Sequence, residues 1–291
     1  MGTAAMAMFG MTLPMTQLAT GTAEAPHFSP MFVTCARAVV AALLSALWLW
    51  RGRAPWPTPG QWALLATAAA GNAVAYPLSL AWALRTETSQ HAAVITALAP
   101  LATSAVAAMV LRQRVAGGFW ACAVAGCGLV VAFSLWRAQQ AGHGWQPAAA
   151  DVWLALGVLG ASVGYVAGAR ITPALGAERV ICWVTLTALP ITLPGALATW
   201  AEQPALASVP ASAWLGFAYV SLFSMRIAFF AWYRALAQGD AVRVSQLQLL
   251  QPFFAMAFAW PIHGQPVAWS SLGFGVAVMA TVALGRRLSS R

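Results

Sequence analysis

Charged residues are scarce in this chain. Only 7% of its 291 residues are charged, none of them is a lysine, and only six are acidic. In contrast, 61% of the residues are hydrophobic and the mean hydropathy is +0.74. A soluble domain of this composition could not cover its apolar surface, so the composition excludes a soluble protein and indicates one that is built into a membrane.

Long polar segments and reactive clusters are missing as well. The longest gaps between apolar stretches fall near residues 56–61, 137–150 and 202–210, so no gap could fold as a domain of its own. All four cysteines lie inside apolar stretches, which is typical of small apolar residues and not of disulfides or metal ligands. No cluster of His, Asp and Glu at one interface offers a nucleophile, a metal site or paired carboxylates. The sequence therefore predicts no enzyme activity, no metal site and no cofactor.

Ten apolar stretches are long enough to cross a bilayer as helices. A hydrocarbon core of about 30 Å needs roughly 17 to 25 mostly apolar residues per helix, since no water is present there to hydrogen-bond an open backbone. The first stretch is the most polar, and it lacks the basic flank of a cleaved signal peptide. We predict an all-α polytopic membrane protein with ten transmembrane helices. The predicted spans cover residues 4–22, 30–50, 61–83, 90–111, 117–136, 151–169, 179–200, 211–233, 242–262 and 267–285.

The arginines are distributed unevenly among the gaps. With the N-terminus in the cytoplasm, the cytoplasmic segments hold eleven of the fifteen arginines, and the outer loops hold two, Arg85 and Arg137. Four of the six acidic residues fall on the outer side. Because cytoplasmic loops carry the excess of positive charge, this pattern predicts a multi-pass protein of the bacterial inner membrane with both termini in the cytoplasm. The formal charge of +9 is then an orientation signal and not a nucleic-acid-binding surface.

The two halves of the chain resemble each other. A shift of 152 residues places Pro100 on Pro252, with a glycine-rich span following each proline. We therefore divide the chain into two five-helix repeats, residues 1–140 and 141–291. An odd number of helices per copy inserts the copies in opposite orientations. Inverted repeats of this kind are typical of transporters, whose halves enclose a site near the bilayer midplane.

Two segments carry a family resemblance. The run from Cys35 to Leu44, Cys-Ala-Arg-Ala-Val-Val-Ala-Ala-Leu-Leu, resembles the arginine-bearing second helix of the drug/metabolite transporter superfamily, EamA type. The run from Leu80 to Leu101, with Pro100 next to its end, is similar to the junction between the third and fourth helices of that family. Together with the ten spans and the two copies, the resemblance covers nearly the whole chain.

The resemblance implies export of small metabolites, with amino acids prominent among them, aromatic or other neutral ones included. It also implies a central cavity that is lined by the first, third and fourth helices of each repeat. The chain departs from the family in one place, where a Gly-Glu pair after the fourth helix reads Arg112-Gln113 here and Gly264-Gln265 in the second copy. We therefore assign no role to an acid at that place.

Arg226 is the deepest unpaired charge that the sequence predicts. It lies fifteen residues into the eighth span, or roughly 22 Å along a helix that rises 1.5 Å per residue. Facing the cavity, its guanidinium could take a substrate carboxylate in two parallel hydrogen bonds. Facing outward, it would extend along the helix toward the cytoplasmic interface. Arg37 matches the arginine of the family's second helix and is expected to play a structural role between helices.

Other candidates are polar or aromatic side chains at membrane depth, where such groups are costly and mark a pathway. Thr96 and Gln248 each lie four residues before a proline, Pro100 and Pro252, that frees a backbone carbonyl, so both prolines are structural or gating candidates. Hydrogen bonding between helices is the alternative explanation for the polar residues. The candidate substrate-binding residues are Thr12, Gln17, Asn72, Tyr76, Thr96, Tyr165, Arg226, Phe229, Gln248 and Gln251.

Few groups could link transport to protons. Every Asp and Glu lies at a span end or in a loop, and His91, four residues after Glu87, forms the one plausible protonatable pair near a span. We therefore expect facilitated diffusion or weakly pH-linked exchange instead of tight antiport.

Other function classes remain as alternatives. Carriers of nucleotide sugars would need more buried cations than Arg37 and Arg226, and carriers of cationic drugs would need a buried acid. A lipid-handling protein or a scaffold would not need polar residues at the midplane. The expected partners are a small-molecule substrate and membrane lipid, with no nucleic acid, and the expected assembly is a monomer or a weak homodimer.

Overall fold

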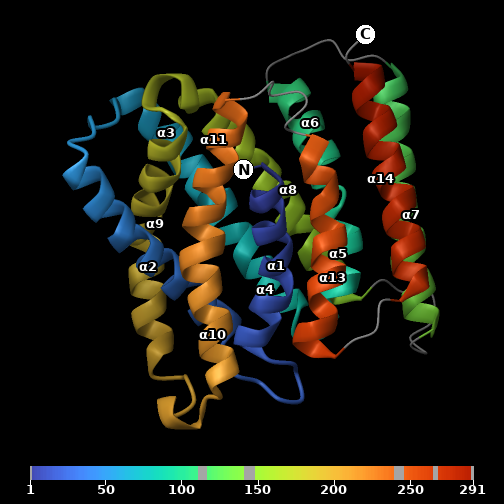
Figure 1. Ribbon diagram of the computed structural model, residues 1–291, viewed down its shortest axis with the longest axis horizontal. Coiled ribbons are helices and arrows are strands. Elements are labelled where there is room, and N and C mark those ends of the chain that lie inside the picture. Colours follow the sequence, from blue (N-terminus) through green and yellow to red (C-terminus); the bar gives the residue numbers. More distant parts are fainter. Residues whose placement is uncertain (1, 111–116, 141–147, 239–245, 265–267, 290–291) are drawn as a thin grey trace.

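The computed structural model describes residues 2–110, 117–140, 148–238, 246–264 and 268–289. In these ranges the chain is helical, and the one departure toward a strand is an isolated bridge between Gly21 and Pro26. Ten helical spans lie where the sequence predicted them, five in each half (Figure 1). The predicted all-α fold is confirmed.

The first five spans are built from eight helical elements. The third span contains a π-helical segment, and the fourth is divided before Pro100. The elements are α1 (Gly2–Thr20), α2 (Pro30–Arg51), α3 (Pro59–Ala68), η1 (Ala69–Ala75), α4 (Tyr76–Ala83), α5 (Ser89–Thr96), α6 (Ala99–Val110) and α7 (Gly117–Gln140).

The second five spans repeat this order. A short 3₁₀ turn, η2 (Leu206–Ser208), lies in the connection before the eighth span. The spans are α8 (Ala149–Leu175), α9 (Ala177–Trp200), α10 (Ala211–Tyr219) with η3 (Val220–Ile227) and α11 (Ala228–Gln238), η4 (Gln246–Leu250) with α13 (Gln251–His263), and α14 (Trp269–Ser289).

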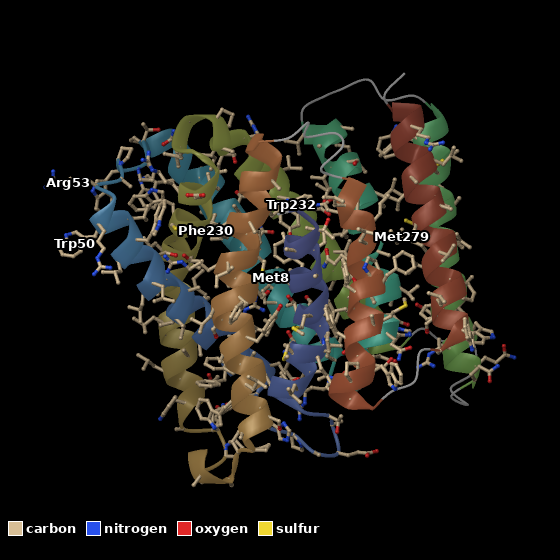
Figure 2. All side chains as sticks on the ribbon, viewed as in Figure 1. Met8, Trp50, Arg53, Phe230, Trp232 and Met279 are labelled. Carbon is tan, nitrogen blue, oxygen red and sulfur yellow. The ribbon has the colours of Figure 1, made fainter. Side chains whose placement is uncertain are left out.

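The outer surface of the bundle is apolar. Within the described residues, seven spans are long and apolar enough to cross a membrane, and α14 contributes a shorter apolar helix, Trp269–Gly285. Large apolar side chains are exposed on the outer faces, and Trp50, with 76% of its surface exposed, points away from the bundle (Figure 2). So much exposed apolar surface suits contact with lipid.

Helical irregularities fall at matching places in the two halves. The π-helical segments η1 and η3 interrupt the third and eighth spans, about 150 residues apart. The fourth span breaks just before Pro100, and the ninth changes from 3₁₀ to α geometry just before Pro252. Each break has a physical cause, since proline removes a backbone donor and a π-turn inserts an extra residue. The shared breaks support the internal repeat.

The two halves run in opposite directions. Asp151, near the start of α8, lies 2.5 Å from His91, near the start of α5. Ser89 in the same turn of α5 bonds to Gln17, near the end of α1. The first helix of the second half therefore begins where the first helix of the first half ends. Figure 1 agrees, because α1 begins in the upper half of the picture and α14 ends at its top.

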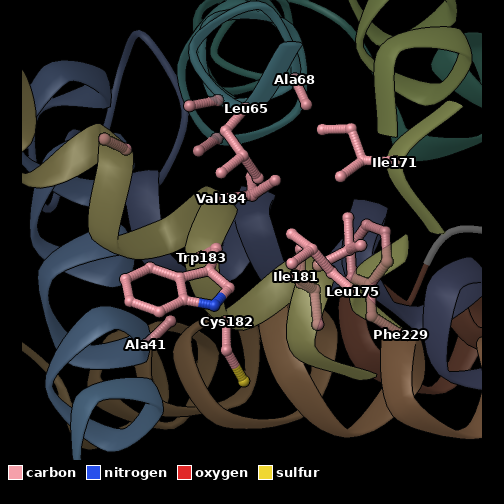
Figure 3. Packing of buried hydrophobic residues seen from close by; sticks show 14 of the residues in the cluster. Ala41, Leu65, Ala68, Ile171, Leu175, Ile181, Cys182, Trp183, Val184 and Phe229 are labelled. Carbon is pink, nitrogen blue, oxygen red and sulfur yellow. The ribbon is translucent and has the colours of Figure 1, made fainter. Parts of the chain in front are cut away.

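Corresponding helices of the two halves pack together. α2 lies along α9, and α7 lies along α14 at one edge of the bundle (Figure 1). A buried cluster around Trp183 on α9 joins α2, α3 and α8 (Figure 3). The third and sixth spans approach so closely that a Cβ at Gly71 would lie 2.2 Å from the carbonyl oxygen of Gly160 and 3.0 Å from the Cα of Gly164.

We expect Gly71→Ala to lower the thermal unfolding temperature in detergent, because the added methyl group meets backbone that cannot turn aside. Overpacking of this kind costs about 1 to 3 kcal/mol. The matched control is Gly128→Ala in α7, where a Cβ meets nothing within 4 Å. Unfolding followed by tryptophan fluorescence measures both, and equal unfolding temperatures for parent and Gly71→Ala would show that the helices do not approach this closely.

Candidate functional site

A cavity of about 440 Å³ lies between the two halves. Its walls come from α1, α4, α5 and α6 of the first half and from α8, α11, η4 and α13 of the second. These elements belong to the first, third and fourth spans of each half, the arrangement that the family resemblance implies. The volume falls within the range of about 300 to 1,000 Å³ that is usual for small-molecule sites.

Seven of the sequence-predicted residues line this cavity. Tyr76 and Tyr165 supply aromatic rings, Gln248 and Gln251 supply amides, and Thr96 supplies a hydroxyl. The two prolines at the helix breaks, Pro100 and Pro252, lie in the same wall. The structure thus brings together residues from five different elements, α4, α5, α6, α8 and the η4–α13 span.

The two glutamine amides are available to a solute. Among the residues that the structure describes, neither Gln248 nor Gln251 has a hydrogen-bond partner, although both are only partly exposed. The hydroxyl of Thr96 differs, because it donates to the carbonyl of Ala92 at 2.8 Å. A partly buried amide without a partner is costly, so a polar ligand or water would satisfy these groups.

Three further polar residues line the cavity, although the sequence analysis did not select them. Thr103 and Ser104 lie seven and eight residues after Thr96, on the same helical face, and this periodicity could have identified them. Thr103 donates to Ser162 at 3.2 Å. Arg170 is the one charged side chain in the described part of the lining, and the sequence analysis placed it in a loop. It lies instead inside α8, which continues to Leu175.

The lining of the cavity is concentrated toward one end of the bundle. Its lining on α8 runs from Ala161 to Arg170, on α6 it extends to Ala107, and on α1 it begins at Met6. These positions lie near the start of α1, near the end of α6 and in the second half of α8, and Figure 1 shows that these parts of the three helices lie toward its upper end. Ala169 and Arg170 are exposed there.

Arg226 does not line the central cavity, contrary to one of the two orientations that the sequence left open. Its guanidinium lies over the ring of Phe230, 5.4 Å from the centroid, and borders a separate groove with Trp48 and Arg51 of α2. Tyr76 and Arg226 each lie six residues before a tryptophan, Trp82 and Trp232, so the repeat places them at matching depths. However, Tyr76 begins α4 after its π-helical segment, whereas Arg226 is still inside η3. The extra residue in a π-turn rotates the helix face, so equal depth does not give equal direction.

Four other predicted residues lie outside the cavity lining. The hydroxyl of Thr12 lies 2.9 Å from that of Ser224, and Asn72 packs against Gly164. Phe229 makes an edge contact with Phe9, which does line the cavity, at a centroid distance of 5.0 Å. The fourth, Gln17, lies at the closed end described below.

Arg37 is buried between the halves. Only 4% of its surface is exposed, and its Nη2 donates to Ser224 Oγ at 3.3 Å and contacts Met225 Sδ at 3.7 Å. Because Arg37 is on α2 and its partners are on η3, the contact joins the two halves. A contact of this kind is what the structural role expected for Arg37 would require, and that role stays a prediction.

Polar contacts close the end of the bundle opposite Arg170. Ser89 Oγ donates to Gln17 Oε1 at 2.7 Å, and Gln17 Nε2 donates to the backbone oxygen of Glu87 at 3.2 Å. These bonds tie the end of α1 to the start of α5. Gln17 therefore belongs to the closure and not to the cavity wall.

An ionisable cluster continues this closure. His91 Nε2 lies 2.5 Å from Asp151 Oδ1, and His91 Nδ1 lies 3.9 Å from Glu87 Oε2. Arg137 Nη2 also lies 3.9 Å from Glu87 Oε2, and the ring of Phe133 stacks on His91 with centroids 5.0 Å apart. The sequence paired His91 with Glu87 but missed Asp151, because that contact joins two helices of different halves.

Comparisons with known proteins agree with this architecture. The model of the EamA-like transporter family matches residues 1–135 and again residues 148–285. The chain is 36% identical over 282 residues to YdeK of Bacillus subtilis (strain 168), an uncharacterized transporter, covering 97% of this chain and 94% of YdeK.

Two more distant likenesses point the same way. The chain is 23% identical over 250 residues to the uncharacterized transporter sll0355 of Synechocystis sp. (strain ATCC 27184 / PCC 6803 / Kazusa), covering 79% of this chain and 73% of sll0355. One solved crystal structure superposes with a TM-score of 0.60 at 20% identity, covering 100% of this chain and 97% of that chain, which shows a shared fold. With the family model matched twice and YdeK similar throughout, the chain is a multi-pass membrane protein that belongs to the EamA-like transporter family.

Proposed function

We propose that the protein exports small metabolites, chiefly neutral or aromatic amino acids, from the bacterial cytoplasm by alternating access. The observation that carries the proposal is the cavity between the two halves, whose lining extends toward one end of the bundle while polar contacts join the helices at the other end. A cavity of this form is what one state of an alternating-access carrier requires.

The chemistry of the lining favours a zwitterion with an apolar side chain. Arg170 offers a guanidinium to a carboxylate, and Gln248 and Gln251 offer amide oxygens to an ammonium group. Phe9 and Trp232 supply apolar walls. No acidic residue lines the described part of the cavity, which disfavours cationic drugs. One guanidinium is also too little for a nucleotide sugar, whose diphosphate needs several cations.

The sidedness of the proposal comes from the arginine distribution. With both termini in the cytoplasm, the cavity faces the cytoplasm, and the contacts around His91 and Gln17 close the outer side. We take residues 1–140 and 141–291 as the two bodies that rock against each other. Outward opening would then separate His91 on α5 from Asp151 on α8 and narrow the bundle around Arg170.

The carboxylate-binding role of Arg170 predicts a change in selectivity. In proteoliposomes, we expect Arg170→Gln to reduce counterflow of labelled amino acids by at least about tenfold, because a charge-assisted hydrogen bond contributes roughly 1.5 to 3 kcal/mol. Counterflow of the corresponding amino-acid amides should change little. The matched control is Arg179→Gln, an arginine near the same end of the bundle that does not line the cavity.

Equal losses for amino acids and amides would contradict the role of Arg170. Gln248→Leu tests the cavity itself, with Gln139→Leu on the exposed surface of α7 as its control. Normal counterflow in Gln248→Leu would favour a scaffold or a lipid-handling protein. A fluorescent protein fused after Arg291 that fluoresces in intact cells would establish the assumed orientation.

The closure by His91 and Asp151 predicts a shift between conformations. Asp151→Ala leaves a buried imidazole without its hydrogen-bond partner, and a buried polar group without a partner costs about 1 to 3 kcal/mol. In a variant without native cysteines that carries Ala92→Cys, a site with 0% exposure, we expect Asp151→Ala to speed maleimide labelling at least several-fold. Glu202→Gln, an exposed acid outside the cluster, is the control. If Asp151→Ala does not change the rate at which Ala92→Cys is labelled, the contact between His91 and Asp151 does not hold this end closed.

We also propose that transport is only weakly coupled to protons. No carboxylate or histidine lines the described part of the cavity, so a proton and a substrate do not compete for one site there. We expect counterflow in proteoliposomes to be unchanged when an ionophore collapses the proton gradient. Uphill accumulation that is driven by an imposed gradient would refute this expectation and would assign a coupling role to His91, Glu87 and Asp151.

A further inference from the structure

A second groove lies on the outside of the bundle, between the last turns of α2 and the π-helical segment η3. It is lined by Leu44, Leu47, Trp48, Arg51, Gly52 and Arg226. It is separate from the central cavity, with which it shares no lining residue. The substrate proposal gives this groove no task.

The rims of the groove are lipid-facing. On α2, Leu43 and Leu47 are 63% and 42% exposed. On the other rim, Phe223 and Ile227 are 43% and 44% exposed. Large apolar side chains exposed on both sides, in a helix bundle that crosses a membrane, contact acyl chains and not water.

Two guanidinium groups in this apolar setting have no acidic partner. In the described part of the chain, neither Arg51 nor Arg226 forms an ion pair with a carboxylate. Arg226 lies over the ring of Phe230, which in turn contacts Trp48 at a centroid distance of 5.6 Å. An aromatic ring orients a guanidinium but does not neutralise it. Cations next to the hydrocarbon are costly, so an anion from outside the chain would stabilise Arg51, which is exposed at the end of α2, and the partly buried Arg226.

We propose that this groove binds an anionic phospholipid, with the phosphate between Arg51 and Arg226 and an acyl chain along Leu43 and Leu47. Charge complementarity selects an anion, and planar guanidinium groups bind phosphate oxygens in pairs. The apolar rims select a phosphate that carries acyl chains over a soluble one. Basic pockets between transmembrane helices at the cytoplasmic side are suited to such headgroups.

The bound lipid would contact both halves of the transporter. α2 belongs to the first half and η3 to the second, and Arg37 already joins these two elements through Ser224 and Met225 on the inner side. A phosphate between Arg51 and Arg226 would join the same elements on the outer side. The inference rests on these contacts alone and holds whatever the substrate proves to be.

Native mass spectrometry of the purified protein tests the proposal. The protein is titrated with phosphatidylglycerol and, separately, with phosphatidylcholine of the same acyl chains. We expect phosphatidylglycerol to be retained preferentially, and we expect Arg226→Gln and Arg51→Gln each to weaken its binding by at least about tenfold. Arg226→Lys should retain part of the affinity, because it keeps the charge and loses the planar fork. Arg179→Gln, near the same end of the bundle but outside the groove, should bind as the parent does.

Three results would overturn the assignment. They are equal retention of the two lipids by the parent, unchanged phosphatidylglycerol binding in both Arg51→Gln and Arg226→Gln, and displacement of the lipid by inorganic phosphate at equal concentration. The last result would show a site for soluble phosphate. Thermal unfolding of each variant identifies any that fail to fold. If Arg226→Gln fails to fold, phosphatidylglycerol binding by Arg226→Lys, compared with that of the parent, tests the role of Arg226 instead.

Discussion

Backbone hydrogen bonding in lipid is the constraint on which this structure depends. Inside a bilayer each N–H and C=O group must be paired within the protein, so a helix can break only where protein or a water-filled cavity covers the break. The breaks before Pro100 and Pro252 lie in spans that line the cavity, and η1 ends where Tyr76 enters its wall. The irregular parts of the helices and the candidate binding site therefore coincide, because a helix break in lipid requires protein or a water-filled cavity beside it.

The sequence was sufficient to predict the features that depend on local patterns. Hydropathy located the ten spans, and the match between Pro100 and Pro252 selected the two prolines next to which the fourth and ninth spans change geometry. Residues close to those breaks, including Thr96, Gln248 and Gln251, could be selected because residues three or four apart lie on the same face of a helix. Contacts between spans follow no local pattern. Asp151 was missed because its partner His91 is sixty residues away in the other half.

The backbones of the two halves follow the same arrangement of helices, but the side chains at matching positions differ. Both carry a π-helical segment and a broken helix at matching positions, yet Thr96 corresponds to Gln248, and Tyr76 corresponds in depth to Arg226. The repeat could therefore predict architecture but not direction at Arg226, where the π-turn changes the helix face. Arg170 was misplaced for a related reason, because the apolar pattern of α8 ends before its hydrogen bonding does.

The charged side chains of this bundle lie in three different surroundings. Arg37 is buried and hydrogen-bonded between the halves, Arg170 is exposed where the cavity lining ends on α8, and His91 pairs with Asp151 at the closed end. Taking apart a buried pair such as the last is costly in a dry interior, but water lowers the cost greatly. In the alternating-access cycle that we propose, opening of the closed end would therefore admit water as the pair separates. Hydration of that end would then be part of the proposed conformational change, and an apolar pair in the same place would not require it.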